Sequence, residues 1–405
     1  MPRLSRFLSL AAALLMAAPS LAIAAETANT VAKLPPIKHV FVITLENENA
    51  IISFGPDTQA PYLAKTLVAE GAFLPNYYGT GHASLDNYIA MVSGQGANPM
   101  TRGDCQPNFK DFKLKSVAQY GQAVGTGCVY PKQIKTIGNQ LAGNRLTWRG
   151  YMEDMGNDPA RESKTCGHPV VNGKDGSETP EAPSKAVPLG DQYATRHNGF
   201  VYFHSVIDAP SCKTEIVNLN ELETDLKKVE TTRNVNFITP NVCNDGHDAP
   251  CVSGKPGGLV SANAWLKKWV PLITESPAFK QDGLLVINFD EGGFQIQTTT
   301  DGKSTTYHAP GASCCGQVAG PNLGKFPATQ QITPTIALAY DNFGGDNTGA
   351  VLISPFIKPG TISRNVPYNH YSLLKTIEDI FHLGHLGYAA QPSVVSFGAD
   401  VFTNQ

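Results

Sequence analysis

Four short apolar runs that each end in polar residues constrain the fold of this chain more than any other feature of its sequence. Short apolar runs bounded by polar or turn-forming residues are typical of β-strands buried in a sheet. The runs, with the residues that follow them, are Val40 to Leu45 before Glu46-Asn47, Val235 to Thr239 before Pro240-Asn241, Leu284 to Phe289 before Asp290-Glu291, and Ala350 to Ile353 before Ser354-Pro355. The sequence therefore predicts buried strands whose ends carry polar side chains.

Amphipathic stretches that lie between these runs predict helices, over Leu85 to Val92, Ala262 to Ile273 and Ser372 to Phe381. Strands that alternate with helices indicate an α/β fold with a mostly parallel central sheet flanked by helices. Ligands of such sheets bind beyond the carboxyl ends of the strands, where we expect the polar residues that follow the four runs.

Two segments, 157–188 and 292–325, are rich in Gly, Ser, Thr, Pro and charge without periodicity, and we expect long loop insertions there. The chain has no Pro/Ser linker, internal repeat or low-complexity block. We therefore expect a single domain over residues 26–405. Nothing in the sequence indicates an oligomeric state.

The first 25 residues have the composition of a secretory signal peptide. Arg3 and Arg6 precede an apolar run from Phe7 to Met16, and small residues follow at 22–25. The run is far shorter than the ~20 residues needed to span a bilayer, which argues against a membrane anchor. We expect cleavage near Ala24 or Ala25 and a mature protein in the periplasm or outside the cell, without stable membrane insertion.

The charge of the mature chain argues against nucleic acid and anionic membrane surfaces as partners. Cleavage would remove two of the 31 basic residues and none of the 34 acidic ones, which leaves a net charge of −5. No basic stripe is present, so the electrostatic footprint of a nucleic-acid-binding protein is missing.

Eight cysteines in an exported chain indicate disulfides. Their order favours the local pairs Cys105 with Cys128, Cys166 with Cys212 and Cys243 with Cys251, and the adjacent Cys314 and Cys315 could pair with each other. The connectivity stays open, because eight cysteines allow about 105 pairings.

Two pairs of polar residues, Glu46-Asn47 and Asp290-Glu291, directly follow apolar runs. Oxygen ligands at two strand ends could hold a divalent cation in a catalytic cleft. The alternatives are a carboxylate that caps the next helix and a solvated charge pair.

Ser84 lies between a glycine-flanked segment, Gly79 to Gly81, and the predicted helix that begins near Leu85. A serine at this position is commonly only a helix cap. As a nucleophile, it would be favoured by the helix dipole and by free backbone N–H groups, which can hold a phosphate.

Asp245, His247 and Asp248 offer three metal ligands or proton carriers within four residues. Cys243 and Cys251 could close the loop that carries them, although a calcium loop or a plain surface turn is an alternative. His370 opens the last predicted helix and could point into the same cleft, or it could only cap the helix or pack against it.

Eight motifs in this order resemble the phosphoesterase family that contains bacterial phospholipases C and secreted acid phosphatases, within the alkaline phosphatase superfamily. The motifs are HVFVITLENEN, GHASLDNYIAMVSG, LTWRGYMEDM, FITPNVCNDGHD, WLKKWVP, VINFDEGG, ISPFIKPG and NHYSLLKTIEDIF. The similarity runs from about residue 38 to about residue 385, and it implies an alkaline phosphatase-like fold.

The resemblance implies a divalent metal cation and a serine nucleophile. Glu46 and Asn47 would bind the metal at one strand end, and Asp290 and Glu291 at another. Ser84 matches the family nucleophile, which also contacts the metal. The wider superfamily commonly has an Asp-His pair where this chain has Asp290-Glu291, and oxygen ligands alone favour Mg²⁺, Mn²⁺ or Ca²⁺ over Zn²⁺.

Further residues match motif positions near the phosphate: His82, Asn87, Asp248 and His370. We expect His247 to act as general acid toward the leaving alcohol, with Asp245 or Asp248 orienting it.

The resemblance favours a broad-specificity acid phosphatase that hydrolyses phosphomonoesters through a phosphoserine. Serine rather than threonine at the nucleophile position, and a chain that ends about 20 residues after the last motif, favour the phosphatase branch over phospholipase C. A catalytically dead phosphate-binding protein is a third interpretation.

Overall fold

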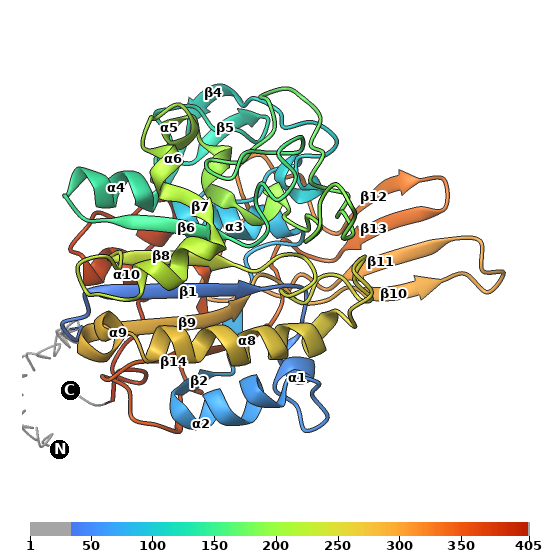
Figure 1. Cartoon of the computed structure of the whole chain (residues 1–405). Coiled ribbons are helices and arrows are strands. Elements are labelled where there is room, and N and C mark those ends of the chain that lie inside the picture. Colours follow the sequence, from blue (N-terminus) through green and yellow to red (C-terminus); the bar gives the residue numbers. More distant parts are fainter. Residues whose placement is uncertain (1–33, 404–405) are drawn as a thin grey trace, which may run out of the picture. The chain divides into compact units, whose positions relative to one another are not determined.

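An eight-stranded mixed sheet lies at the centre of the part of the chain that the structure, a computed structural model, describes, residues 34–403 (Figure 1). Its strands follow the order β15-β2-β14-β9-β1-β8-β6-β7. They are β1 (His39–Leu45), β2 (Ala72–Leu74), β6 (Trp148–Met152), β7 (Ile216–Asn218), β8 (Val235–Thr239), β9 (Gly283–Phe289), β14 (Ala350–Ile353) and β15 (Thr361–Ile362). The predicted signal peptide and its cleavage site near Ala24 or Ala25 lie outside the described residues.

The four predicted strands are all present, and three of them, β8, β1 and β9, are parallel neighbours at the middle of the sheet. The α/β fold with a mostly parallel sheet is therefore confirmed. Two of the polar strand ends, those after β1 and β9, meet at one edge of the sheet.

The expectation that all four polar ends share this edge is wrong for β14, which runs antiparallel to β9. The chain already lies at the carboxyl edge before β14 begins, because the N–H of Gly292 bonds to the carbonyl of Gly345. β14 must therefore run back across the sheet. Ser354 reaches the opposite edge, where its hydroxyl donates to the carbonyl of Gly283 at 2.6 Å.

Helices cover both faces of the sheet because alternate residues of β1 point to opposite sides. The helices are α1 (Ala50–Ser53), α2 (Val68–Glu70), α3 (Ser84–Ser93), α4 (Ile137–Gly143), α5 (His204–Ile207), α6 (Cys212–Glu215), α7 (Leu222–Asp225), α8 (Gly258–Thr274), α9 (Pro277–Asp282) and α10 (His370–Ile380). Val40 and Val42 join the core formed with α3 and α10, whereas Phe41 and Ile43 join the core formed with α8.

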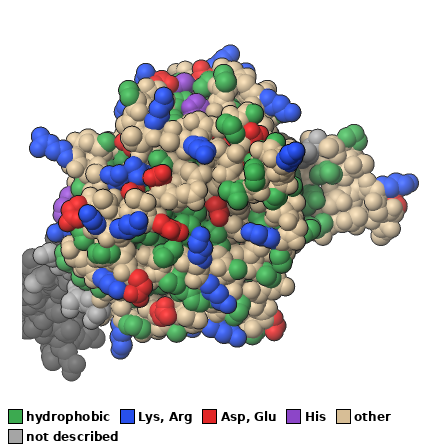
Figure 2. Space-filling view, in the orientation of Figure 1, with side chains coloured by type: hydrophobic (Ala, Val, Ile, Leu, Met, Phe, Trp, Pro, Cys, Tyr) green, Lys and Arg blue, Asp and Glu red, His purple; other side chains and the backbone are tan. Residues whose placement is uncertain are grey.

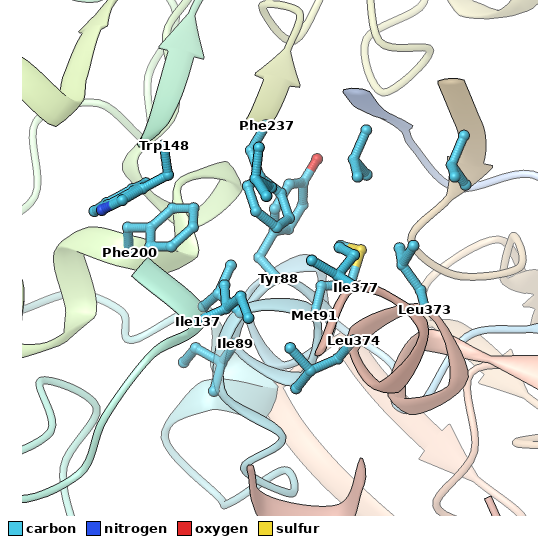
Figure 3. Packing of buried hydrophobic residues seen from close by; sticks show 14 of the residues in the cluster. Tyr88, Ile89, Met91, Ile137, Trp148, Phe200, Phe237, Leu373, Leu374 and Ile377 are labelled. Atoms are coloured by element: carbon cyan, nitrogen blue, oxygen red, sulfur yellow. The ribbon is translucent and has the colours of Figure 1, made fainter. Parts of the chain in front are cut away.

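The core between α3 and α10 fixes the position of the first turn of α3 (Figure 3). Met91 of α3 lies beside Leu374 and Ile377 of α10, and both helices are almost completely buried. Trp148 and Phe200 pack next to them with ring centroids 4.4 Å apart. This packing holds α3 rigidly under the carboxyl edge of the sheet.

A second, four-stranded sheet follows β9, in the order β10-β11-β13-β12. Its strands are β10 (Gln295–Thr298), β11 (Thr305–Ala309), β12 (Ala328–Thr333) and β13 (Ile336–Tyr340). The prediction of an irregular loop over 292–325 is therefore wrong in part, because β10 and β11 lie within it. The segment 157–188, in contrast, contains no helix or strand.

Two strand pairs complete the fold, β3 (Tyr77–Tyr78) with β16 (Tyr368–Asn369), and β4 (Lys113–Val117) with β5 (Ala123–Thr126). All four expected disulfides are present: Cys105–Cys128, Cys166–Cys212, Cys243–Cys251 and Cys314–Cys315. Within residues 34–403, no helix has both the length and the apolar character needed to cross a bilayer.

Candidate active site

Ser84 is the first residue of α3, and its hydroxyl does not cap the helix. Ala83 occupies the cap position with φ 108°, outside the helical region. The Ser84 hydroxyl donates instead to Oε2 of Glu46 at 2.8 Å. The left-handed backbone at Ala83 is strained for a residue with a Cβ, and the bond from its N–H to Oε2 of Glu291 at 3.0 Å holds it there. The geometry therefore aims Ser84 at a carboxylate and away from its own helix.

Three buried carboxylates gather here: Glu46 and Asp290, which directly follow β1 and β9, and Asp245, which lies in the loop after β8. Burial raises the pKa of Glu46, and the charges of Asp290 and Asp245 raise it further. Burial also raises the pKa of Asp245 and of Asp290. Three acids gathered out of water oppose ionisation unless a cation neutralises them.

Asp290 leaves one oxygen atom available in this group. Its Oδ1 accepts the N–H of Asn47 at 3.1 Å and that of Glu291 at 2.7 Å. Its Oδ2 is buried and accepts no hydrogen bond from any described residue. A buried carboxylate oxygen without a donor is the kind of atom that a bound cation satisfies.

His197, which could not be placed from the sequence, also belongs to this group. Its Nδ1 lies 3.0 Å from Oδ2 of Asp245, and its Nε2 lies 3.5 Å from Oε2 of Glu46. Burial lowers the pKa of His197, and the neighbouring charges of Arg196 and His247 lower it further, so the ring is neutral. Nδ1–H then donates to Asp245 and leaves Nε2 without a hydrogen, as in many metal-binding histidines.

One possible metal-binding set consists of Glu46, His197 and His247, whose ligand atoms lie within 4.8 Å of one another. Tyr88 helps to hold two of the three in place. Its hydroxyl donates to Oε1 of Glu46 at 2.8 Å, and its ring stacks on His197 with centroids 5.4 Å apart. The donor atoms therefore fit a divalent cation, with nitrogen beside oxygen.

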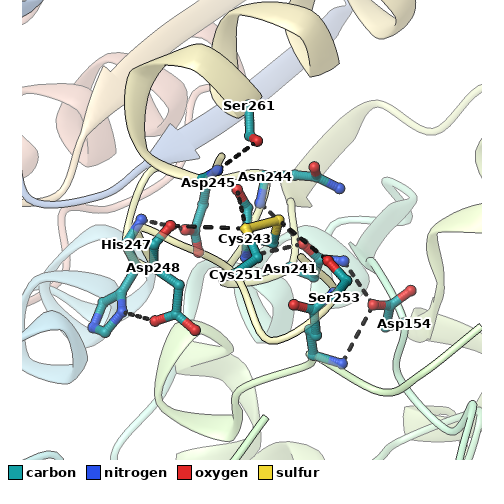
Figure 4. Close-up of a disulfide and its surroundings, with 12 residues drawn as sticks. Asp154, Asn241, Cys243, Asn244, Asp245, His247, Asp248, Cys251, Ser253 and Ser261 are labelled. Carbon is teal, nitrogen blue, oxygen red and sulfur yellow. Dashed lines mark hydrogen bonds and ion pairs between the residues drawn. A yellow bond between two sulfur atoms is a disulfide. The ribbon is translucent and has the colours of Figure 1, made fainter. Parts of the chain in front are cut away.

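The Cys243–Cys251 disulfide closes the loop that carries Asp245, His247 and Asp248 (Figure 4). The N–H of His247 donates to Oδ1 of Asp245 at 2.8 Å. Its Nδ1 lies 2.8 Å from Oδ1 of Asp248, so Asp248 orients the ring. These contacts turn the His247 ring away from the disulfide.

Arg196 contacts the other ring nitrogen of His247, with its Nη2 3.2 Å from Nε2. Because arginine can only donate, Nε2 accepts in this arrangement. Arg196 is buried and also pairs with Glu178 at 3.0 Å. The structure thus places a fixed cation beside His247 that the sequence reasoning missed.

His82 lies behind Glu291, buried between two carboxylates. Its Nδ1 lies 2.5 Å from Oε2 of Glu291, and its Nε2 lies 2.8 Å from Oδ2 of Asp346. Burial lowers the pKa of His82, but the two carboxylates outweigh burial and raise it to about 10. The charged ring therefore contacts the candidate ligand Glu291, where the resemblance implied a position near the phosphate.

Asn87 holds the loop that precedes Ser84. Its Oδ1 accepts the N–H groups of Thr80 at 2.8 Å and Gly81 at 3.1 Å, and its Nδ2 donates to the carbonyl of Gly81 at 2.9 Å. The amide is thereby committed to the loop.

His370 holds the end of β9. Its Nε2–H donates to the carbonyl of Asp290 at 2.6 Å, and Nδ1 lies 3.0 Å from the hydroxyl of Tyr77. Burial lowers the pKa of His370 to about 4, which keeps the ring neutral. Both contacts position the backbone beneath the site.

A cavity of about 1020 Å³ opens over these residues. Of the predicted site residues, Asn47, Ser84, His247 and Glu291 line it. Glu46 contacts Ser84, Asp245 contacts His247, and Asp290 accepts the N–H groups of Asn47 and Glu291. His82, Asn87 and His370 support the site from behind.

Comparison with known proteins decides the family. The model of the Phosphoesterase family matches residues 40–384, most of the chain. The chain belongs to the phosphoesterase family. The predicted enzyme class, a hydrolase acting on phosphoric ester bonds, is confirmed at this level.

Relatives of this phosphoesterase include the phosphate-repressible acid phosphatase of Penicillium chrysogenum, which is 25% identical over 343 residues, covering 79% of this chain and 68% of that protein. An acid phosphatase of Aspergillus fumigatus is 24% identical over 78% of this chain and 63% of its own length. The phosphatidylinositol-3-phosphatase of Mycobacterium tuberculosis is 23% identical over 91% and 85% of the two chains. A solved member of the alkaline phosphatase superfamily from Vibrio parahaemolyticus is 11% identical with a TM-score of 0.47, over 90% of this chain and 71% of that one.

Proposed function

We propose that this phosphoesterase is an exported, metal-dependent acid phosphatase that hydrolyses phosphomonoesters through a phosphoserine at Ser84. The observation that carries the proposal is the Ser84 hydroxyl, which lines the cavity at the N-terminus of α3 and donates to the buried carboxylate of Glu46. The names of the fungal and mycobacterial relatives support a phosphatase.

A divalent cation would be held by Glu46, Asn47, Ser84, Asp290 and Glu291. When bound, it would neutralise the carboxylates, favour the Ser84 alkoxide and stabilise charge on the phosphate. His197 adds a nitrogen donor near Glu46 through its Nε2. This donor extends the set of suitable cations from the hard Mg²⁺, Mn²⁺ and Ca²⁺ to metals that accept imidazole.

The reaction that this chain's residues support is a pair of displacements at phosphorus. Ser84 Oγ forms a bond to phosphorus as its proton passes to Glu46 Oε2, and the bond to the leaving alcohol breaks. Asp248 orients His247 beside the cavity, where it would protonate the leaving oxygen once its Nε2 carries a proton in place of the Arg196 contact. Water then attacks phosphorus as one of its protons passes to His247. The bond between phosphorus and Ser84 Oγ breaks, Glu46 returns the proton to Ser84, and phosphate leaves.

Export to the periplasm or the cell exterior is part of the proposal. Four disulfides fit an oxidising compartment, and the first 25 residues fit a signal peptide. The single phosphoesterase domain would then occupy residues 26–405, with a small phosphoester as its substrate.

The test compares wild type with Ser84→Ala on p-nitrophenyl phosphate. We expect kcat to fall at least about 10³-fold, since the group that forms the covalent intermediate is removed. Ser93→Ala is the matched control, because Ser93 ends the same helix and its hydroxyl bonds only to backbone, donating to the carbonyl of Ile89 and accepting the N–H of Gln95. Near-normal turnover by Ser84→Ala would refute the nucleophile assignment.

Two further substrates separate the rival activities. A phosphatase should prefer p-nitrophenyl phosphate over p-nitrophenylphosphorylcholine and phosphatidylcholine. The opposite preference would establish a phospholipase C, and no turnover of any ester by metal-loaded wild type would indicate a phosphate-binding protein.

A further inference from the structure

A row of directly opposed residues crosses the four-stranded sheet. Ile296 of β10 lies opposite Tyr307 of β11, which lies opposite Leu338 of β13, which lies opposite Gln330 of β12. Opposed residues in a sheet point to the same face. All four line the cavity that contains Ser84, so one face of this sheet forms a wall of the candidate active site.

The sequence of β13 makes the middle of this wall apolar, whereas β12 contributes Gln330 and Gln331. Ile336, Leu338 and Tyr340 line the cavity, and the residues between them are the small Ala337 and Ala339. Among the described residues, none of the strand side chains that line the cavity carries a charge. The strand side chains of the wall therefore offer contact area to a ligand and no charge of their own.

Part of the wall is open to solvent. Ile296 is 66% exposed, and Tyr307 and Leu338 are half-buried. Hydrophobic side chains gather where the four-stranded sheet joins the rest of the molecule (Figure 2). An exposed apolar surface beside a cleft is typical of a binding surface.

Phe294 connects the wall to the phosphate end of the cavity. Its ring centroid lies 5.0 Å from that of His82, the partner of Glu291, and 6.4 Å from those of Tyr307 and Tyr340. Arg102 closes the far side, with its guanidinium carbon 3.8 Å from the Tyr340 ring centre, within the range of a cation–π contact. One cavity thus joins Ser84 to an aromatic and aliphatic surface.

We propose that this wall binds the alcohol part of the substrate, and that the preferred substrate is a soluble phosphomonoester of an apolar, preferably aromatic, alcohol. The inference rests on the proposed function, because the phosphate of such a substrate must lie at Ser84. The alcohol would then extend over Phe294 toward Tyr307 and Leu338, where it displaces water from both surfaces.

Soluble n-alkyl phosphates test the wall, because their leaving alcohols differ in apolar area while the reacting bond stays the same. For metal-loaded wild type we expect kcat/KM to rise from ethyl through butyl to hexyl phosphate by twofold or more per methylene, with an upper limit of about fourfold for complete burial. In Leu338→Ser and Tyr307→Ser the rise per methylene should fall toward onefold, so that hexyl phosphate loses more kcat/KM than ethyl phosphate does.

The matched control is Ile362→Ser, an apolar strand residue of the other sheet that is 44% exposed. It should keep the wild-type dependence on chain length. A flat series in wild type, or an unchanged rise in both wall variants, would overturn the proposal. A higher kcat/KM for phosphatidic acid in vesicles than for hexyl phosphate would contradict a soluble substrate and indicate a lipid instead.

A binding measurement separates the failure of this inference from the failure of the proposed function. Calorimetry should show tighter binding of hexylphosphonate than of ethylphosphonate to wild type, and a reduced difference for Leu338→Ser. If wild type binds hexylphosphonate more tightly than ethylphosphonate but turns over no ester, only the phosphatase assignment is contradicted. Equal affinities would contradict only the apolar wall.

Discussion

Replacing Glu46 by glutamine should stabilise the metal-free protein while it weakens metal binding. The carboxylate lies among Asp245 and Asp290, and its raised pKa means that ionisation costs free energy in the folded state. Glutamine has nearly the same shape and no charge. It keeps one acceptor oxygen for the hydroxyls of Ser84 and Tyr88, each 2.8 Å from Glu46 in wild type.

Two opposing effects set the size of the change. Losing one of the two hydrogen bonds costs about 1 kcal/mol. Above the raised pKa of Glu46, wild type loses about 1.4 kcal/mol of stability for each unit by which folding raises that pKa. Removing the charge should therefore gain more stability than the lost hydrogen bond costs. The raised pKa also determines how the stability difference depends on pH. The stability advantage of Glu46→Gln should grow as the pH rises above the pKa of Glu46 in the unfolded chain.

A saturating cation should reverse the order of stability. At 100 times its Kd, a ligand that binds only the folded state adds about 2.7 kcal/mol. For about 370 folded residues, this corresponds to a rise in Tm of roughly 3 to 4 °C. The rise should appear in wild type and be smaller in Glu46→Gln, which lacks one charged ligand.

Thermal unfolding in a chelator, and then with added Mg²⁺, Mn²⁺, Ca²⁺ or Zn²⁺, measures both effects. Glu223→Gln is the control, because Glu223 is an exposed glutamate of α7 and should show the wild-type response. A Glu46→Gln variant that is no more stable than wild type in chelator, or whose metal-induced rise in Tm equals that of wild type, would contradict this prediction.

Three other outcomes are expected. Changing both Cys243 and Cys251 to serine should lower stability by about 2 to 3 kcal/mol, since the disulfide closes a loop with a sequence separation of 8, and an unchanged Tm would contradict this. Asn87→Ala should lower the free energy of unfolding by about 2 to 5 kcal/mol and lower kcat, because two loop amides lose their acceptor. Asn87→Asp keeps that acceptor, so equal Tm values for the two variants would argue against this role of Asn87. Burial raises the pKa of Glu378 to about 9. Between pH 5 and 8, wild type should therefore lose up to about 1.4 kcal/mol of stability per pH unit through this group. Urea unfolding of wild type and Glu378→Gln measures this loss, and a stability difference between them that does not change with pH would refute it.

The elements that periodicity predicted are those whose burial is continuous along the chain. The runs that became β1, β8 and β9 are buried along their whole length, and α10 buries one residue after another on its apolar side. Strand direction was not predictable, because an apolar run reads the same for either orientation. The direction of β14 depends on where the preceding loop leaves the chain.

The four-stranded sheet was missed because β10 has no buried residue and carries mostly polar side chains. Its strands are defined by pairing across the sheet, which a local pattern does not contain. The same limit applies to Arg196 and His197, which lie in a single 3-10 turn, Thr195–His197, that has no apolar periodicity. The chain packs Phe200 and Tyr202 into the core, and that packing brings the His197 ring to Glu46 and Asp245 and the Arg196 guanidinium to His247.

The residues that follow apolar strands were easier to identify, since the end of a parallel strand fixes where the next side chain lies. Glu46 and Asp290 are of this kind. The supporting roles of Asn87 and His370 were not visible, because the motif that suggests a site residue does not say whether its side chain faces the cavity or the backbone beneath it.

The start of α3 carries Ser84, Asn87 and Tyr88. The Ser84 hydroxyl bonds to Glu46, the Asn87 amide bonds to the preceding loop, and Tyr88 contacts both Glu46 and His197. An α-helix turns by about 100° per residue. A deletion or insertion of one residue at the start of α3 would therefore move all three side chains at once. The spacing between Ser84 and Tyr88 should be as intolerant of change in chain length as any single side chain is of substitution.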